Sequence, residues 1–302
     1  MVGPHCFYIL IFIKQVLSHG VYWVVMAITI TKEDGTKEPF DPEKLHFTLG
    51  KAGTPKDVRD RIIAHIEREL IDGMSTRKIY RHAFNLLRKE ARPAAARYSM
   101  RRAVLAFGPT GFPFETFVGE IFKVKGYRVH TDQILKGSCV EHEVDMIAER
   151  PGECIAAELK FHNSLAIKTD VQVALYVEAR FEDLKAGSER EQQFCVSRGM
   201  LVTNTKFTHQ AIAYGECKKL SLIGWNYPQE GNLHDLIAET RMHPITSLTT
   251  LSNSDKARLL AERVVLCQTL LERHDLLSSL GFSSAKADAV IAEAGTLCRK
   301  QL

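Results

Sequence analysis

The stretch HEVDMIAERPGECIAAELK, residues 142–160, decides the fold of the larger part of the chain. We interpret Glu143–Ala148 and Cys154–Lys160 as two β-strands. Arg150-Pro-Gly152 lies between them and supplies the residues that favour a tight turn. The two segments are therefore predicted to pair as a hairpin.

Helices and strands alternate on both sides of this hairpin. Apolar residues at helical spacing in Phe114–Phe122 predict an amphipathic helix, and a strand at Tyr127–Val129 follows it. Beyond the hairpin we expect, in order, a helix, a strand, a helix and a last strand, at Asp170–Glu182, Gly199–Thr203, Thr208–Gly215 and Leu220–Trp225. This order predicts an α/β fold.

The hairpin is predicted to bring two carboxylates and an ammonium group together. Residues two apart on a strand point to the same face, so Glu158 and Lys160 project together, and strand pairing places Asp145 beside them. Carboxylates bind Mg²⁺ or Mn²⁺, which lowers the pKa of bound water, and a lysine steadies the charge that develops. Asp145 and Glu158 are thus candidate metal ligands, and Lys160 is a candidate catalytic residue.

Other interpretations of these residues remain open. A glutamate and a lysine two apart on a strand are commonly a solvated surface pair, and an aspartate followed by Glu-x-Lys also arises by chance. Glu120, Glu141 and Glu143 are competing carboxylates, and His142 and His162 flank the site in either a structural or a phosphate-binding role.

The spacing of Asp145, Glu158 and Lys160 resembles that of the PD-(D/E)XK nucleases, and the surroundings resemble the Mrr-type restriction endonucleases. In that family a helix before the strands supplies an acidic residue from a Phe-Glu pair, which here is Phe114-Glu115. Val144 departs from the pattern, since it stands where the superfamily name has proline. The resemblance implies a restriction-endonuclease-like core, metal-dependent cleavage of DNA and a catalytic role for Glu115.

Two further segments are candidate DNA contacts. Gln172 and Tyr176 resemble the QxxxY element that some nucleases of this fold carry in the helix after the core strands. Asn204 and Lys206 follow a predicted strand and precede a helix, where polar donors are suited to binding a phosphate backbone.

The region before the α/β part is basic and helical. Ile28–Thr31 and Glu38-Pro-Phe40 are predicted to form a small hairpin, followed by a helix capped by Asp41 and two further helices. A fourth helix is expected over about Pro93–Leu105. Within residues 51–102, 14 Lys or Arg face 6 Asp or Glu, a balance that favours polyanions but also fits a solvated helix face.

This region resembles an ATP-cone, the nucleotide-sensing domain of ribonucleotide reductases and of a reductase repressor. The likeness rests on TKEDGTKEPFDPEKL and GMSTRKIY. It implies that ATP or dATP binds as a regulatory ligand, at positions that match Lys32, Glu38, Asp41, Lys44, Thr76 and Tyr80. Glu33 departs from the family pattern, which usually has a basic residue there.

These interpretations divide the chain of 302 residues into four parts. We expect an apolar extension at residues 1–25 that translation from Met26 would omit, an ATP-cone at 26–106, a nuclease domain at 112–226 and a helical region at 227–302. Seven scattered cysteines predict reduced thiols and a cytoplasmic protein, and the interrupted apolar runs before residue 30 argue against a membrane span. A homo-oligomer is expected from the ATP-cone resemblance.

The predicted function is a Mg²⁺-dependent endodeoxyribonuclease regulated by ATP or dATP. The alternative is a nucleotide-sensing regulator that binds nucleic acid through a nuclease-like fold without cleaving it. A form tethered to a membrane through its first 25 residues is a third possibility.

Overall fold

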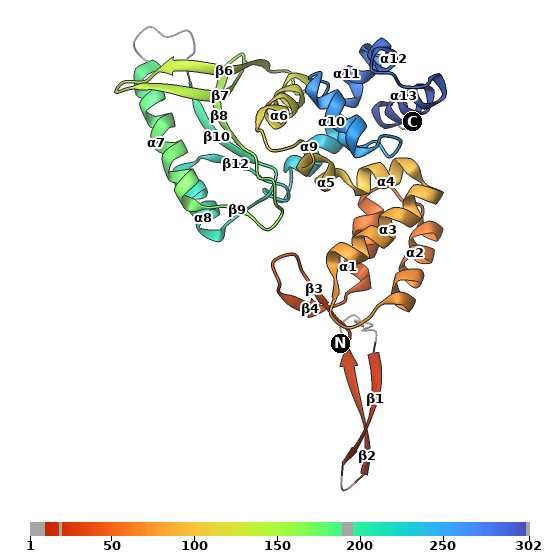
Figure 1. Cartoon of the computed structure of the whole chain (residues 1–302). Coiled ribbons are helices and arrows are strands. Elements are labelled where there is room, and N and C mark those ends of the chain that lie inside the picture. The colour runs from red at the N-terminus through yellow and green to blue at the C-terminus, as the bar shows by residue number, and fades with distance from the viewer. Residues whose placement is uncertain (1–9, 18–19, 189–195, 300–302) are drawn as a thin grey trace. The chain divides into compact units, whose positions relative to one another are not determined.

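A five-stranded mixed sheet lies at the centre of the larger unit of the protein (Figure 1). The structure is a computed structural model that describes residues 10–17, 20–188 and 196–299. The strand order is β12-β10-β8-β7-β6, with bounds of Ser221–Ile223, Arg198–Thr203, Glu153–Lys160, Glu141–Arg150 and Arg128–Lys136. Strands β6, β7 and β8 are antiparallel neighbours, and β10 runs parallel to both β8 and β12. The predicted hairpin and the α/β class are both confirmed.

Helices cover both faces of this sheet. Helix α6 (Phe112–Val124) packs its buried Phe114, Phe117 and Ile121 against one face. Helices α7 (Val171–Ser188) and α8 (His209–Lys218) cover the other face, as Figure 1 shows. Alternate residues of β8 enter opposite cores, because successive side chains of a strand point to opposite sides. The short strands β9 (Lys168–Thr169) and β11 (Lys206–Phe207) pair in parallel beside the sheet.

The C-terminal region is helical, as predicted. Its elements are α9, the short 3-10 helix η1, and α10 to α13, at Leu233–Thr240, Ile245–Ser247, Asn253–Ala261, Cys267–Glu272, Asp275–Ser279 and Ser284–Cys298. Helices α10 and α11 are separate because the chain turns between them at Arg263, which has a left-handed φ of 59°. Val265 and Leu266 then enter the core that also contains α6. These helices therefore share the core of the sheet.

The N-terminal unit is a small sheet with four helices. Its strands lie in the order β4-β3-β5, with bounds of Lys37–Pro39, Thr29–Thr31 and Met74–Ser75. Helices α1 to α4 span Pro42–Lys51, Lys56–Glu69, Thr76–Glu90 and Arg92–Tyr98. The predicted hairpin and the first three helices are confirmed. Asp41 caps α1 by accepting a hydrogen bond of 2.9 Å from the Glu43 amide.

The helix predicted over Pro93–Leu105 is in fact two helices, and the prediction of one continuous helix was wrong. Helix α4 ends at Tyr98 and α5 spans Met100–Leu105. The Ser99 hydroxyl donates to the carbonyl of Ala96 at 3.0 Å, a local bond that competes with helix continuation. The chain divides at this point into two compact units, residues 1–99 and 100–302.

The apolar segment at the start of the N-terminal unit contains two paired strands. Strands β1 (Leu10–Leu17) and β2 (Gly20–Ala27) run antiparallel, with Leu10 opposite Ala27. Among the described residues, no helix has the length and apolar character needed to cross a membrane.

Candidate functional site

Strands β7 and β8 stop pairing at the predicted catalytic and metal-binding residues. Their paired residues extend no further than Met146 and Ala157, although β8 continues to Lys160. Beyond this point the Asp145 side chain takes the place of a backbone partner, because its Oδ2 accepts a hydrogen bond of 2.7 Å from the Leu159 amide. The fold thus brings Asp145 beside the end of β8 that carries the other predicted residues.

Glu158 faces helix α7. The Tyr176 hydroxyl donates to Glu158 Oε1 at 2.6 Å, and Arg180 Nη1 donates to Oε2 at 2.6 Å. The Glu158 side chain is only 13% exposed. Both carboxylate oxygens are therefore engaged, and a cation bound here would use the remaining lone pairs or replace one of the two donors.

Lys160 lies two residues beyond Glu158 on the same strand and is half-buried. Among the residues that the structure describes, none forms a hydrogen bond or ion pair with its ammonium group. Burial, followed by the charge of Lys160, lowers the pKa of His162. The lysine charge is therefore not neutralised by a direct partner, and an anion that enters the site can pair with it.

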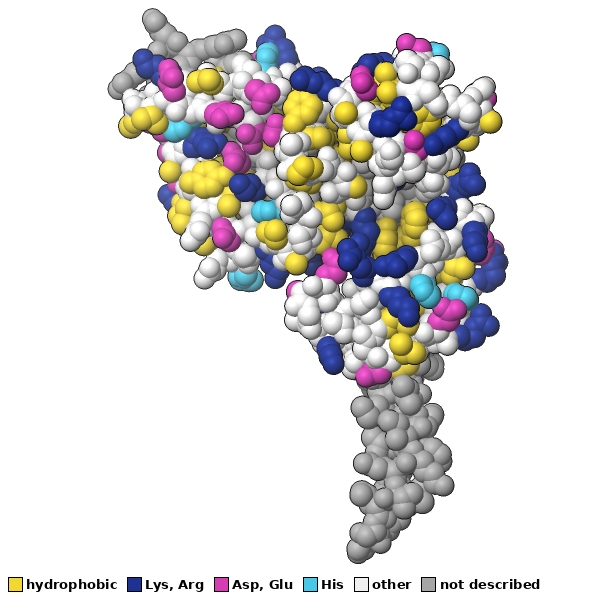
Figure 2. Space-filling view, in the orientation of Figure 1, with side chains coloured by type: hydrophobic (Ala, Val, Ile, Leu, Met, Phe, Trp, Pro, Cys, Tyr) yellow, Lys and Arg dark blue, Asp and Glu magenta, His cyan; other side chains and the backbone are white. Residues whose placement is uncertain are grey.

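Glu115 lies in the first turn of α6, and its pKa is raised to about 7. Burial is the main cause, followed by the negative charges of Asp145, Asp132, Glu143 and Glu158. Burial is the main reason that the pKa of Asp145 is raised to about 6. The hydrogen bond from the Leu159 amide opposes this rise, and repulsion from Glu158 adds to it. Figure 2 shows acidic side chains gathered between strands β6–β8 and helix α6. The site therefore gathers several carboxylates whose negative charge is not fully balanced by neighbouring positive groups.

These carboxylates suit a divalent cation in chemistry, but their oxygens do not converge on one point. In the described part of the chain, no group of three ligand atoms within 4.8 Å of one another includes Glu115, Asp145 or Glu158. Hard oxygen donors that repel one another are nonetheless the donor set that Mg²⁺ takes, since a bound cation relieves the repulsion.

Two residues of this site were missed by the sequence analysis. Asp132 lies on β6 in the left-handed region, with a φ of 53°, between the positions that pair with Val144 and Met146. No sequence pattern indicated its role. Arg180 lies four residues after Tyr176, and residues four apart share a helix face, so the predicted role of Tyr176 could have pointed to it.

The predicted DNA contacts fall into two groups. Gln172 is exposed near the start of α7, and Tyr176 binds Glu158 directly. Asn204 is only 2% exposed, and its amide bonds both the amide and the carbonyl of His162, at 2.8 and 2.7 Å. Asn204 therefore holds a loop and is not available to DNA, whereas Lys206 lies exposed on β11.

The predicted nucleotide residues of the hairpin and α1 form one charged cluster. Glu38 Oε2 lies 2.6 Å from Lys32 Nζ and 3.4 Å from Lys44 Nζ. The bond from Lys32, opposed in part by burial, holds the pKa of Glu38 below its ordinary value. Asp41 lies at the start of α1 as its N-cap. The two ammonium groups are thus gathered at one point of the surface.

The two predicted residues on α3 have different surroundings. Thr76 is the first residue of the helix, and the cap is Ser75, whose hydroxyl accepts from the Lys78 amide at 3.3 Å. The Tyr80 ring stacks on Tyr98, with centroids 5.1 Å apart and an interplanar angle of 10°. Tyr80 therefore contributes to the packing of the N-terminal unit.

Two segments of the chain match known protein families. Residues 28–104 match the ATP cone domain, which confirms that prediction and indicates a nucleotide ligand. Residues 243–298 match the family described as AF1548-like, C-terminal. The nuclease resemblance of the region between them remains a prediction.

Relatives and solved structures extend the second match. An uncharacterized protein of Archaeoglobus fulgidus is 32% identical over 178 residues, which cover 59% of this chain and 97% of that protein. The crystal structure of AF1548, a protein of unknown function, matches this protein with a TM-score of 0.51 and 30% sequence identity. The match covers 63% of this chain and 98% of the AF1548 chain. MspJI restriction endonuclease in complex with a 27-mer oligonucleotide has a TM-score of 0.32 at 14% identity, over 56% of this chain and 36% of that one, which is too distant to assign a fold. The extent and identity of these matches show that the chain belongs to the AF1548-like family.

Proposed function

We propose that the protein is a Mg²⁺- or Mn²⁺-dependent endodeoxyribonuclease whose activity responds to ATP or dATP. The observation that carries this proposal is the concentration of carboxylates at the end of β8, next to the ammonium of Lys160, which has no direct partner among the described residues. Burial and mutual repulsion raise the pKa of Glu115 to about 7 and that of Asp145 to about 6. Sites of strongly perturbed pKa in a small cluster of this kind are commonly catalytic.

Glu115, Asp145 and Glu158 would hold the cation. Asp145 keeps Oδ1 unused by the Leu159 bond, which leaves one oxygen free to bind. The cation would supply a water of lowered pKa and would offset charge on the phosphate. Lys160 would bind a non-bridging phosphate oxygen and stabilise the negative charge that grows there during cleavage.

The nucleotide site of the proposal lies in the N-terminal unit. Lys32 and Lys44 both pair with Glu38 and are both more than 40% exposed. Phosphate oxygens can replace the single carboxylate, because each ammonium group has further donors available. We expect ATP and dATP to act as regulatory ligands there, and DNA to be the partner of the second unit.

One observation favours a second function, a nucleotide-sensing regulator that binds nucleic acid without cleaving it. Both oxygens of Glu158 are engaged by Tyr176 and Arg180, in short bonds of 2.6 Å. A carboxylate held permanently in this way would not bind a metal, and the site would then present only Lys160 and neighbouring polar groups to DNA.

A plasmid cleavage assay separates the two functions. The full chain is incubated with supercoiled DNA and Mg²⁺, with and without ATP or dATP, beside Lys160→Ala. Lys123→Ala is the matched control, because Lys123 pairs with Glu120 on the surface of α6. We expect cleavage that is lost in Lys160→Ala, retained in Lys123→Ala and altered by nucleotide. If all three proteins bind DNA and none of them cleaves it, the regulator is favoured.

A further inference from the structure

A second cluster of ligand-forming side chains lies in the N-terminal unit, between helices α2 and α3. These helices pack through apolar faces, with Ile62 and Ile66 of α2 and Ala83 and Leu87 of α3 in one core. The residues that border this interface are polar. His65 and Glu69 lie four apart on α2 and therefore on one helix face. His82 precedes the buried Ala83 and reaches toward them from α3.

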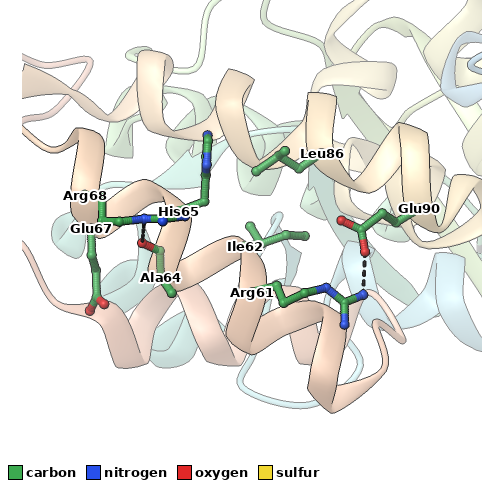
Figure 3. Close-up of a pocket in the computed structure, with 8 residues that line it drawn as sticks. All are labelled: Arg61, Ile62, Ala64, His65, Glu67, Arg68, Leu86 and Glu90. Carbon is green, nitrogen blue, oxygen red and sulfur yellow. Dashed lines mark hydrogen bonds and ion pairs between the residues drawn. The ribbon is translucent and has the colours of Figure 1, made fainter.

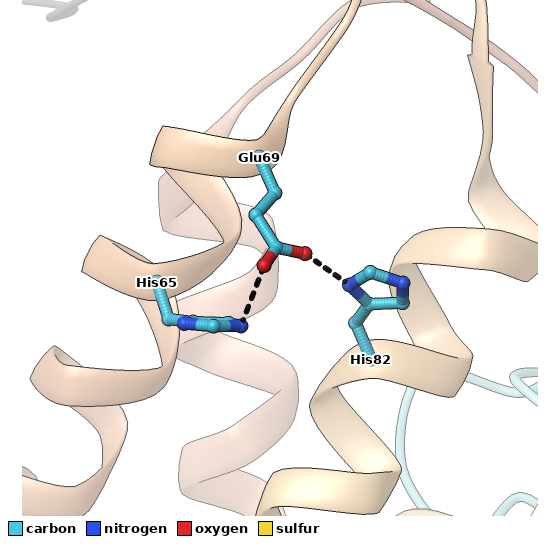
Figure 4. A group of neighbouring side chains, drawn as sticks. All are labelled: His65, Glu69 and His82. Atoms are coloured by element: carbon cyan, nitrogen blue, oxygen red, sulfur yellow. Dashed lines mark ion pairs between the residues drawn. The ribbon is translucent and has the colours of Figure 1, made fainter.

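The three side chains point toward one another, with the Glu69 carboxylate between the two imidazole rings, as Figure 4 shows. Glu69 Oε1 lies 3.2 Å from His65 Nε2, and Glu69 Oε2 lies 2.9 Å from His82 Nδ1. The ligand atoms of all three residues lie within 4.8 Å of one another. In the part of the chain that the structure describes, no other three histidine, cysteine or acidic residues meet this condition.

We propose that His65, Glu69 and His82 bind a divalent transition-metal ion of the Zn²⁺ class. Two imidazole nitrogens and one carboxylate are a common protein ligand set for such an ion. At metal–ligand distances of about 2.1 Å, tetrahedral ligand atoms stand about 3.4 Å apart. The two histidines pair with different oxygens of Glu69, so a shared ion requires one of these oxygens and the two imidazole nitrogens, which all lie within 4.8 Å of one another, to turn toward a common point.

The site is open to solvent, and a fourth position is left for water. The side chains of His65, Glu69 and His82 are 37%, 46% and 31% exposed. His65 also lines a pocket of about 730 Å³. Figure 3 shows this pocket with His65 and the seven other residues that line it. Three protein ligands with one open position are typical of zinc sites that exchange water.

The ligand chemistry distinguishes this site from the proposed nuclease site. Imidazole nitrogen favours Zn²⁺, Co²⁺ or Ni²⁺ over Mg²⁺, which prefers oxygen donors. A metal here would also join α2 to α3, because His65 and Glu69 come from one helix and His82 from the other. Binding should therefore resist the separation of these helices during unfolding.

Co²⁺ is the probe, because a tetrahedral cobalt site absorbs visible light. The full chain, with accessible cysteines first blocked by iodoacetamide, is titrated with Co²⁺ in excess Mg²⁺ to occupy oxygen-only sites. The variants are His82→Ala and Glu69→Gln, which keep the buried core intact. His46→Ala is the matched control, since His46 lies in the same unit but faces the single carboxylate of Asp60 at 3.6 Å.

We expect one equivalent of Co²⁺ to produce a visible spectrum that Zn²⁺ abolishes by displacement. The spectrum should persist in His46→Ala and disappear in His82→Ala and Glu69→Gln. Zn²⁺ at 100 times its Kd should lower the unfolding constant of the parent about 100-fold and leave that of His82→Ala unchanged. A parent protein without the spectrum, or a spectrum that survives in His82→Ala, would overturn the proposal and leave an ion-pair network at this position.

Discussion

Replacing Asp145 by asparagine should stabilise the folded protein at pH 8 while it abolishes cleavage. Asparagine keeps the shape of the side chain and an oxygen that can accept the Leu159 hydrogen bond, but it carries no charge. A rise in the pKa of Asp145 from 3.8 to about 6 corresponds to about 3 kcal/mol of unfavourable free energy for the ionised form. We take about half of this, about 1.5 kcal/mol, because the site is partly open to solvent.

The effect has a defined dependence on pH. A carboxyl group whose pKa is raised by folding is protonated in the folded protein and ionised in the unfolded chain between the two pKa values, so the stability of the parent falls as pH rises through this window. The full cost of Asp145 is present above about pH 6 and is absent below about pH 3.8. The advantage of Asp145→Asn should therefore be largest at pH 8 and vanish near pH 4.

Urea unfolding of both proteins at pH 8 and pH 4 measures this directly. Asp183→Asn is a control of opposite sign, because hydrogen bonds from His142 and from Cys139 hold the pKa of Asp183 well below its ordinary value. That variant should lose stability at pH 8. The reasoning is refuted if Asp145→Asn is less stable than the parent at pH 8, or if its advantage is equal at both pH values.

Three further substitutions test other parts of the structure. Asn204→Ala should lower the free energy of unfolding by about 1–3 kcal/mol, because the partly buried amide and carbonyl of His162 lose their partners; chemical denaturation measures the loss, and an unchanged midpoint would contradict it. Glu293→Gln should cost about 2 kcal/mol, since the buried carboxylate accepts four hydrogen bonds from the loop at residues 249–250 and an amide group can accept only some of them. Lys32→Ala should weaken ATP binding about 3- to 5-fold in calorimetry, the effect of one exposed ion pair, while Lys37→Ala on the same hairpin should leave it unchanged.

The sequence was most informative where function depends on neighbours along the chain. The turn at Pro151-Gly152 fixed the pairing of two strands, so Asp145 could be placed beside the end of β8 before the structure was known. The alternation of side chains along a strand likewise predicted that Glu158 and Lys160 project from the same face of one strand. Both inferences need only local geometry, and local geometry follows from the order of residues.

Contacts between distant segments were not predictable in the same way. Arg180 reaches Glu158 across 22 positions of sequence. Asn204 looked like a polar residue of an exposed loop, but it is buried against His162, 42 positions away. Glu293 lies in an alanine-rich helix, and nothing in the sequence around it indicates the loop at residues 249–250 that it binds. Periodicity indicates which face of a helix or strand is buried, but the partner is decided by how the elements pack.

Under the proposed nuclease function, a bound cation has to compete with Arg180 for Glu158. Arg180 brings one positive charge to one carboxylate, in a partly buried pair whose side chains are 28% and 13% exposed. A divalent cation brings two charges and in the proposed site would be shared by Glu115, Asp145 and Glu158, where burial and then mutual repulsion raise the pKa values of Glu115 and Asp145. We therefore expect the cation to displace Arg180 from Glu158. The released guanidinium group would lie beside the site, where it can bind the phosphate that the cation attracts.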